Sequence, residues 1–343
     1  MEQLLDLTIY RSGGHWLLVT ITALSVLLGI GGVFNLFRTE PLRQKELLRL
    51  LTLINLLFVG GFLMIGWLHW SIHQNLPLNL SPRLAEWLNQ QLGAANTGAA
   101  YGLPLYNPQA PPRYSIPLWI EHEKYYFWFL CFSLLAQATW GMLVNHRFRG
   151  AVQLVIAIQG VILLAVADPF AEPLPKFFTE ITPWFTVDVG PMAKAGMFMK
   201  LYPRMIFYYN AHYMWLHPPM LFLAYACITL TFLASCFMLV RRDPPIEKLG
   251  YSAAKLGYLM LTLGMLLGYP WALQAWGPNW WWDPKIGSSI MMWMVYSGYL
   301  HTRLYANKPA MWYFSSLLGI LCFVAMIYTF LASFLFPGEH TFQ

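Results

Sequence analysis

Apolar residues in this chain fall into long continuous runs, separated by polar or proline-rich segments. A helix that crosses a membrane needs about 20 mostly apolar residues. Eight runs meet or approach this length, and they cover residues 16–37, 50–70, 122–144, 151–167, 218–240, 256–275, 288–305 and 311–336. The pattern predicts an all-α integral membrane protein with about eight transmembrane helices. We expect the first run to remain in the mature protein, since it is too long for a signal-peptide core.

The Lys and Arg residues indicate which ends of these helices face the cytoplasm. Segments 38–49, 145–150, 241–255 and 303–310 hold twelve Lys and Arg within 41 residues, whereas the remaining loops and termini hold nine within 132. The positive-inside rule therefore places the first set in the cytoplasm and both chain termini outside.

Two of the outer loops, at 71–121 and 168–211, are long and rich in proline. Loops of this length are usually functional or bind partners. We expect them to form a cap, with a short amphipathic helix near Pro82–Gln91. No repeat or linker divides the chain, so residues 1–343 are interpreted as a single polytopic membrane domain.

Composition supports the membrane assignment and excludes several classes of protein. Hydrophobic residues make up 58% of the chain and charged residues only 10%, against about 25% charged in soluble domains. A soluble enzyme or a nucleic-acid-binding domain is therefore excluded, although the net charge is +6. The four cysteines all lie in apolar runs and form neither a C-x-x-C pair nor a C-x-x-C-H motif, which argues against disulfides and against covalent haem attachment to this chain.

Tryptophans gather in one outer segment, which reads Trp276-Gly-Pro-Asn-Trp280-Trp281-Trp282-Asp283-Pro-Lys285. An aromatic belt at the membrane interface accounts for one or two tryptophans per helix end, but not for four within seven residues. We interpret the segment as a rigid aromatic platform for a planar ligand such as a porphyrin. Asp283 is expected to cap the helix that follows it.

Two histidines flank this segment at predicted outer helix ends. His217 precedes Pro218-Pro219, and His340 follows Phe336-Pro337-Gly338. Two neutral imidazoles on opposite faces of one iron, beside an aromatic wall, would make a bis-histidine haem site. The alternative is that both side chains are interfacial anchors.

His301 differs from these two because it lies within a predicted span, thirteen residues after Ser288 and about 20 Å along the helix. A histidine inside a span is a functional candidate. The alternative is a helix-end residue beside Arg303.

The second half of the chain resembles a known family. Residues 276–285 are similar to the tryptophan-rich WWD signature of the haem-handling cytochrome c assembly family that includes CcsA, CcmC and CcmF. The run Gly298–Arg303 resembles the continuation of that signature in CcsA, and His217–Leu221 resembles the H-P-P motif of CcmF. The resemblance covers about residues 205–343, which we treat as the WWD-like region.

The resemblance implies a haem-binding component of cytochrome c maturation. It would move or present haem at the outer face for thioether attachment to apocytochrome c. His217 and His340 would then be the outer iron ligands, and His301 would be a ligand of an intramembrane haem. Haem-binding residues would be Trp276, Trp280, Trp281, Trp282, Asp283 and Lys285, the last a cation that can meet the propionates.

The same resemblance implies one or two b-type haems and a CcsB-like membrane partner, with no nucleic acid. It also implies a bacterial or organellar inner membrane, with the platform on the outer side. The family usually has Glu after the Asp-Pro-Lys run, where this chain has Ile286. An alternative therefore stays open: a haem-b electron-transfer subunit of a quinol-linked respiratory complex, working with other respiratory subunits and an outer redox protein. Whether the chain is part of a cytochrome c haem lyase, and hence of an enzyme, is left open.

Overall fold

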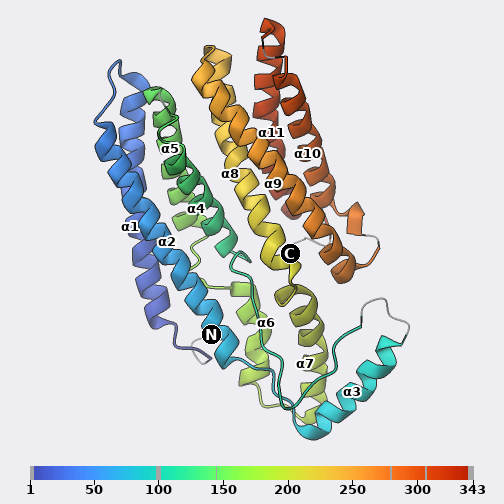
Figure 1. The fold of residues 1–343 in the computed structure, drawn as a ribbon. Helices are drawn as coiled ribbons and strands as arrows, with labels where there is room; N and C mark the ends of the chain where they lie inside the picture. The colour runs from blue at the N-terminus through green and yellow to red at the C-terminus, as the bar shows by residue number, and fades with distance from the viewer. Residues whose placement is uncertain (1–3, 98–101, 144, 279, 306, 339–343) are drawn as a thin grey trace.

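The computed structural model describes residues 4–97, 102–143, 145–278, 280–305 and 307–338, and in this part every regular element is a helix (Figure 1). Each of the eight apolar runs lies wholly or mostly within one helix. These helices are α1 (Thr8–Phe37), α2 (Gln44–Asn75), α4 (Glu123–Ala138), α5 (His146–Val166), α8 (Tyr213–Val240), α9 (Pro244–Trp276), α10 (Pro284–Arg303) and α11 (Pro309–Leu335).

Six of these helices in the described part are long and apolar enough to cross a membrane, namely α1, α2, α5, α8, α9 and α11. The chain therefore has the character of a multi-pass membrane protein. Helix α4 has only 16 residues, and neither it nor α10 is among the six. The expected total of eight crossings stays a prediction.

The outer segments contain more helix than their prolines suggest. The expected amphipathic helix is present as α3 (Pro82–Asn96), which confirms that prediction. Residues 168–211, expected as a loop, are mostly helical, with α6 (Pro175–Thr186), α7 (Pro191–Arg204) and the π-helix η1 (Met205–Tyr209). Proline is favoured at the first helical position because it needs no hydrogen-bond partner there, and Pro175 and Pro191 take that position.

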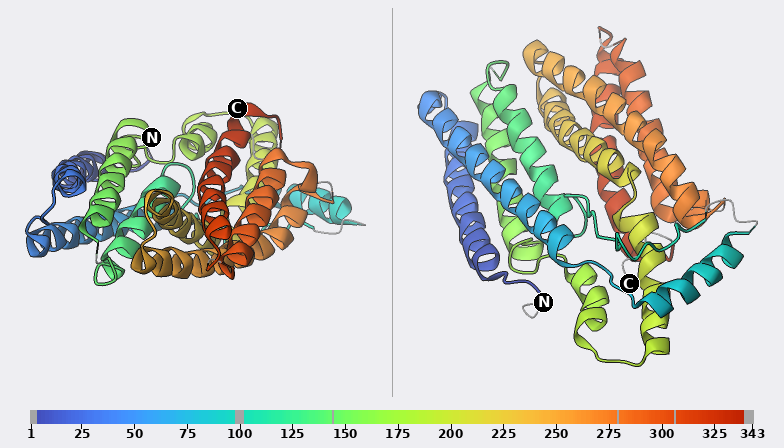
Figure 2. Two further views of the ribbon diagram at one scale, coloured as in Figure 1. Left: turned by 90° about the horizontal axis from the view of Figure 1, so that it is seen from above. Right: turned by 60° about the horizontal axis from the view of Figure 1, so that its bottom comes forward.

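The long helices form two groups of four, which Figure 2 shows most clearly from above. One group contains α1, α2, α4 and α5, and the other contains α8 to α11. Within the groups, α1 packs against α5, α8 against α9, and α10 against α11. Helix α4 connects the groups, because it contacts both α2 and α8.

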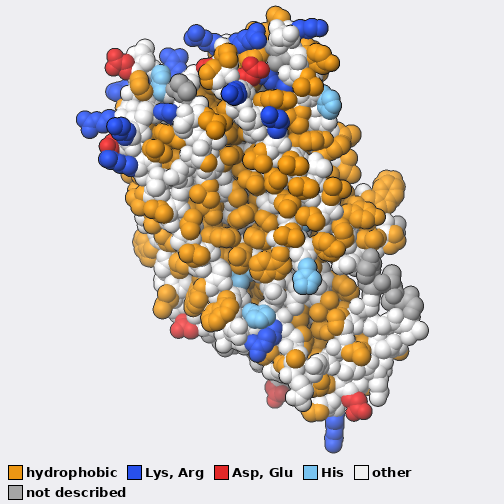
Figure 3. Space-filling view, viewed as in Figure 1, with side chains coloured by type: hydrophobic (Ala, Val, Ile, Leu, Met, Phe, Trp, Pro, Cys, Tyr) orange, Lys and Arg blue, Asp and Glu red, His pale blue; other side chains and the backbone are white. Residues whose placement is uncertain are grey.

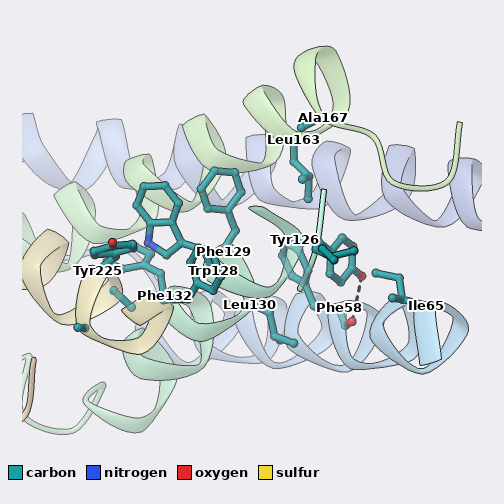
Figure 4. Packing of buried hydrophobic residues seen from close by; sticks show 14 of the residues in the cluster. Phe58, Ile65, Tyr126, Trp128, Phe129, Leu130, Phe132, Leu163, Ala167 and Tyr225 are labelled. Carbon is teal, nitrogen blue, oxygen red and sulfur yellow. Dashed lines mark hydrogen bonds between the residues drawn. The ribbon is translucent and has the colours of Figure 1, made fainter. Parts of the chain in front are cut away.

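Aromatic side chains fill the seam between the two groups. The Trp128 ring of α4 stacks on Phe330 of α11, with centroids 5.1 Å apart and planes 4° apart. Tyr225 of α8 contacts the same Phe330 ring at 5.2 Å. On the other side of α4, the Tyr126 hydroxyl donates to the Phe58 carbonyl of α2 at 2.9 Å (Figure 4). Such aromatic contacts add to the free energy of burial.

The surface charges are segregated along the helix axes. Lys and Arg side chains gather at one end, and a hydrophobic band covers the middle (Figure 3). The cationic end holds the α1–α2, α8–α9 and α10–α11 connections, and α1 begins and α11 ends at the opposite end. We call the cationic end the inner end and the opposite end the outer end, following the positive-inside rule.

This orientation predicts the outcome of cysteine labelling in intact cells. Gln109 and Lys248 are both exposed, one in the outer segment and one at the inner start of α9. A cysteine that replaces Gln109 should react with a membrane-impermeant thiol reagent, and one that replaces Lys248 should react only after permeabilisation. The opposite pattern would invert the topology and with it the side of the tryptophan segment.

Candidate functional site

The tryptophan segment lies at the outer end of the second helix group, between α9 and α10. Helix α9 ends at Trp276, and Gly277 turns the chain with a φ of 75°, a conformation that glycine adopts without strain. A short 3-10 helix, η2 (Trp280–Trp282), follows. Asp283 then caps α10, since its Oδ1 accepts the N–H of Lys285 at 2.9 Å. The predicted cap is confirmed.

His217 lies inside a helix rather than ahead of one, which corrects the expectation from its two prolines. Helix α8 begins at Tyr213 and includes Pro218 and Pro219. A proline has no N–H for the carbonyl four residues earlier. Here the Met214 carbonyl instead accepts the indole N–H of Trp119 at 2.6 Å. The helix can therefore start one turn before the prolines.

The imidazole of His217 is oriented by helix α9. Its Nδ1 lies 2.6 Å from the Gly264 carbonyl oxygen, which can only accept, so Nδ1 is the donor. A Cβ atom added at Gly268 would lie 2.7 Å from the ring, so only glycine leaves room for the ring there. In the neutral ring this hydrogen bond leaves the lone pair on Nε2. Metal-binding histidines commonly have this arrangement, with a carbonyl accepting from the other nitrogen.

Two tryptophans of α9 form a wall beside His217. The Trp271 ring is nearly parallel to the imidazole, with centroids 6.4 Å apart and planes 23° apart. Trp276 packs edge-on against Trp271 at 4.6 Å. The indole N–H of Trp271 donates to the Phe207 carbonyl in η1 at 2.9 Å, which ties the wall to the outer cap.

The other three tryptophans do not continue this wall as one flat surface. Trp280 contacts Tyr269 of α9 edge-on at 5.3 Å. Trp281 and Trp282 stack on each other at 4.3 Å and point outward, with 51% and 74% of their surfaces exposed. The structure thus divides the predicted platform into a packed inner part, Trp276 and Trp280 beside Trp271, and an exposed outer pair, Trp281 and Trp282.

The C-terminal segment approaches this region. A Cβ atom added at Gly338 would lie 2.6 Å from Asp283 Oδ2, so the chain after α11 passes directly over the start of α10. His340 lies outside the described residues, two positions further along.

Lys285 is half-buried in the first turn of α10, outside the six apolar spans. Burial lowers the pKa of Lys285 to about 8, and the Asp283 carboxylate partly offsets this.

His301 is not brought to this site. It lies at the other, inner end of α10, seventeen residues after Pro284, which corresponds to about 25 Å along the helix. Its Nδ1 lies 2.8 Å from the Ser297 carbonyl in the preceding turn, and the side chain is exposed. The structure therefore separates His301 from His217 and the tryptophans.

Sequence reasoning missed several residues that build the site. The indole N–H groups of Trp119 and Trp271 donate to backbone carbonyls of other segments. Gly264 and Gly268 form the surface on which the imidazole lies. The spacing of the two glycines was a usable signal, since residues four apart share one face of a helix. The role of Trp119 had no local signal, because its partner is distant in the sequence.

A family model described as Cytochrome C assembly protein matches residues 119–340, which is more than half of the chain. No solved structure matches the chain.

Curated relatives match over a shorter stretch. The cytochrome c biogenesis protein CcsA of Synechococcus sp. (strain WH7803) is 42% identical over 74 residues, 20% of this chain and 23% of that protein. CcsA of Prochlorococcus marinus (strain MIT 9303) is 47% identical over 62 residues, 18% of this chain and 20% of that protein. The matched stretches span about a fifth of the length of these relatives.

The contact between Trp119 and Met214 leads to a stability prediction. Replacing Trp119 with Phe leaves the buried Met214 carbonyl without the indole donor, so the free energy of unfolding should fall by about 1–2 kcal/mol. Denaturation of the purified protein in detergent measures this. Trp16→Phe, at a 67% exposed position on α1, is the matched control and should have little effect. Equal losses in both variants would contradict the assigned role.

Proposed function

Because the chain belongs to the cytochrome c assembly protein family, we propose that it binds haem at the outer end of α8 to α11 and presents it for thioether attachment to apocytochrome c. The observation that supports this most directly is His217, whose Nδ1 is bound to the Gly264 carbonyl beside the Trp271 ring. A fixed tautomer next to an aromatic wall suits a neutral axial ligand of haem iron.

Each group in the site then has a task that its chemistry allows. His217 and His340 would hold the haem iron, and the histidine of the incoming apocytochrome would take the place of one of them. The exposed stack of Trp281 and Trp282 covers the apolar macrocycle. The two indole rings then pack on an apolar surface instead of facing water. The haem supplies the vinyl groups to which the apocytochrome thiols add. The protein positions the vinyl groups and the thiols for reaction and excludes water from them.

The remaining features of this proposal follow the family. We propose one or two b-type haems, the second near His301, and a CcsB-like membrane partner together with apocytochrome c. The membrane would be a bacterial or organellar inner membrane, with the tryptophans on the outer side. The family name of the CcsA relatives, cytochrome c biogenesis protein, supports the process rather than these details.

One residue favours a second candidate function. Ile286 stands where the family usually has a carboxylate, and it contributes its backbone N–H to the Asp283 cap. Without that carboxylate, a haem that stays bound and passes electrons from quinol to an outer redox protein is the alternative. Incubation of haem-loaded protein with an apocytochrome that contains C-x-x-C-H separates the two. Transfer of haem supports maturation, and complete retention supports the electron-transfer subunit.

The outer ligands lead to a prediction about haem content. His217→Ala and His340→Ala should each change the haem spectrum and lower the haem content in a pyridine haemochrome assay. The double variant should do little more, because the two ligands act as a unit. His212→Ala, at an exposed position near the start of α8, is the control. A double variant with wild-type spectrum and content would exclude these ligands.

His301 gives a separate prediction for a second haem. If it ligates a haem near the inner end, His301→Ala should remove one b-type haem, and added imidazole should restore it in His301→Gly. The outer haem should be unaffected, since His301 lies about 25 Å along α10 from its outer end. His146→Ala, also at the inner end, is the control. Unchanged haem content in His301→Ala would leave His301 as a helix-end residue.

A further inference from the structure

The first turn of α8, which carries His217, is weakly attached to the rest of its own helix. Pro218 and Pro219 follow it directly, and neither has an N–H to donate to the carbonyl four residues earlier. Two successive hydrogen bonds of the helix are therefore missing just after His217. Contacts from outside the helix then set the direction of this turn.

The outer segment just before α4, residues 113–119, attaches to this turn at two points, and we call it the bridging segment. At its end, the indole of Trp119 donates to the Met214 carbonyl at 2.6 Å. Near its beginning, it bonds to the side chain of Asn210. Asn210 lies just before α8 and Met214 lies in its first turn. Because there are two attachments, they determine the direction of the turn as well as its position.

Asn210 holds one edge of the bridging segment with both ends of its side-chain amide. Its Oδ1 accepts the N–H of Ser115 at 2.7 Å, and its Nδ2 donates to the Arg113 carbonyl at 2.8 Å. The backbone N–H of Asn210 donates to the Met205 carbonyl at 2.7 Å, which closes η1. Asn210 therefore connects the bridging segment to the junction of η1 and α8.

Two histidines of α2 hold the opposite edge of the bridging segment. The Nδ1 of His69 lies 2.9 Å from the Ile116 carbonyl oxygen, and the Nδ1 of His73 lies 2.8 Å from the Tyr114 carbonyl oxygen. A carbonyl oxygen can only accept, so each imidazole is the donor. In an extended chain successive residues direct their N–H and C=O groups to opposite edges, as in a β-strand. Alternate residues of the segment therefore face α2 and Asn210.

These hydrogen bonds connect a helix of the first group to the start of α8 in the second. Tyr114 and Ile116 are both buried, and buried backbone groups need partners within the protein. The bonds on the α2 edge therefore cannot simply be exchanged for bonds to water. A displacement of α2 is passed to the bridging segment, and from there to the turn that carries His217.

We propose that the bridging segment positions His217 as a haem ligand, with Asn210 on one edge and His69 and His73 on the other as positioning residues. The inference rests on the proposed function, in which His217 binds haem. When either edge is loosened, the first turn of α8 can move about the proline pair. The imidazole is then less often in the position that suits the iron, so haem affinity falls although the positioning residues act only through the backbone.

Asn210 has a matched control on α3. Asn89 makes the same pair of bonds, since it accepts the N–H of Tyr106 at 2.7 Å and donates to the Tyr106 carbonyl at 2.9 Å. In the purified full-length protein in detergent, Asn210→Ala and Asn89→Ala should lower the free energy of unfolding by similar amounts. In an absorbance titration with haem, Asn210→Ala should bind roughly tenfold more weakly than wild type, and Asn89→Ala should bind like wild type.

The spectrum of the bound haem gives a readout that a loss of stability alone does not change. In Asn210→Ala, added imidazole should alter the spectrum at lower concentrations than in wild type or Asn89→Ala, because a free ligand competes better with a poorly held His217. If Asn210→Ala does not fold, Asn210→Asp and Asn89→Asp repeat the comparison. Aspartate keeps the acceptor of the asparagine side chain and loses the donor.

A conservative pair of variants tests the α2 edge. His73 is half-buried, and His73→Leu removes the donor to the Tyr114 carbonyl, so haem binding should weaken by roughly threefold to tenfold. His73→Asn should restore the affinity, because the amide nitrogen of Asn is as many bonds from Cβ as the imidazole Nδ1. Asn210→Ala and His73→Leu loosen the same segment, so their effects on haem affinity should combine non-additively.

The outcomes distinguish the levels of the proposal. Equal haem affinity and equal imidazole response in Asn210→Ala and Asn89→Ala overturn the positioning role of Asn210 and leave haem binding intact. Equal haem affinity in wild type and His73→Leu overturns the connection to α2. A wild type that does not bind haem overturns the proposed function and this inference together.

Discussion

Backbone carbonyls in an apolar environment need hydrogen-bond donors, and the candidate site depends on how this need is met. Pro218 leaves the Met214 carbonyl without its helical partner, and the indole of Trp119 replaces the missing N–H. A few residues earlier, the Phe207 carbonyl accepts from the indole of Trp271. The segment before His217 is thus attached by one tryptophan to the chain just ahead of α4, and by another to α9. The imidazole has a defined position because its backbone does.

Much of the fold could be predicted from the sequence, because burial in lipid imposes long apolar runs that a single sequence displays. The boundaries were less predictable. The sequence predicts a loop around Pro175 and Pro191, although both prolines begin helices, and it predicts a helix start at Pro218, although that helix starts at Tyr213. At Pro175 and Pro218 the outcome depends on a residue that is distant in the sequence, since Glu121 accepts the first N–H groups of α6 and Trp119 donates to the Met214 carbonyl. Proline alone does not distinguish a helix start from a helix interior.

The site was predictable in its chemistry and less so in its geometry. His217 and the tryptophans were identified by residue type and by their position at an outer helix end. The division of the tryptophans into a packed wall and an exposed pair follows from contacts with Trp271 and Tyr269, which no local pattern indicates.

The first three helices lie outside the part that matches the family model, yet the site needs them indirectly. The match begins at Trp119, the residue that bonds to Met214, and it includes all of α4. Helix α4 is short, and α2 supplies polar partners along its length: Asn55 donates to the Ser133 carbonyl at 3.3 Å, and Gln137 donates to Thr52 at 3.0 Å. Hydrogen bonds of this kind hold helices together where lipid provides no hydrophobic driving force. The N-terminal helices therefore fix α4, and α4 in turn holds the aromatic seam and the adjoining Trp119 against the second helix group.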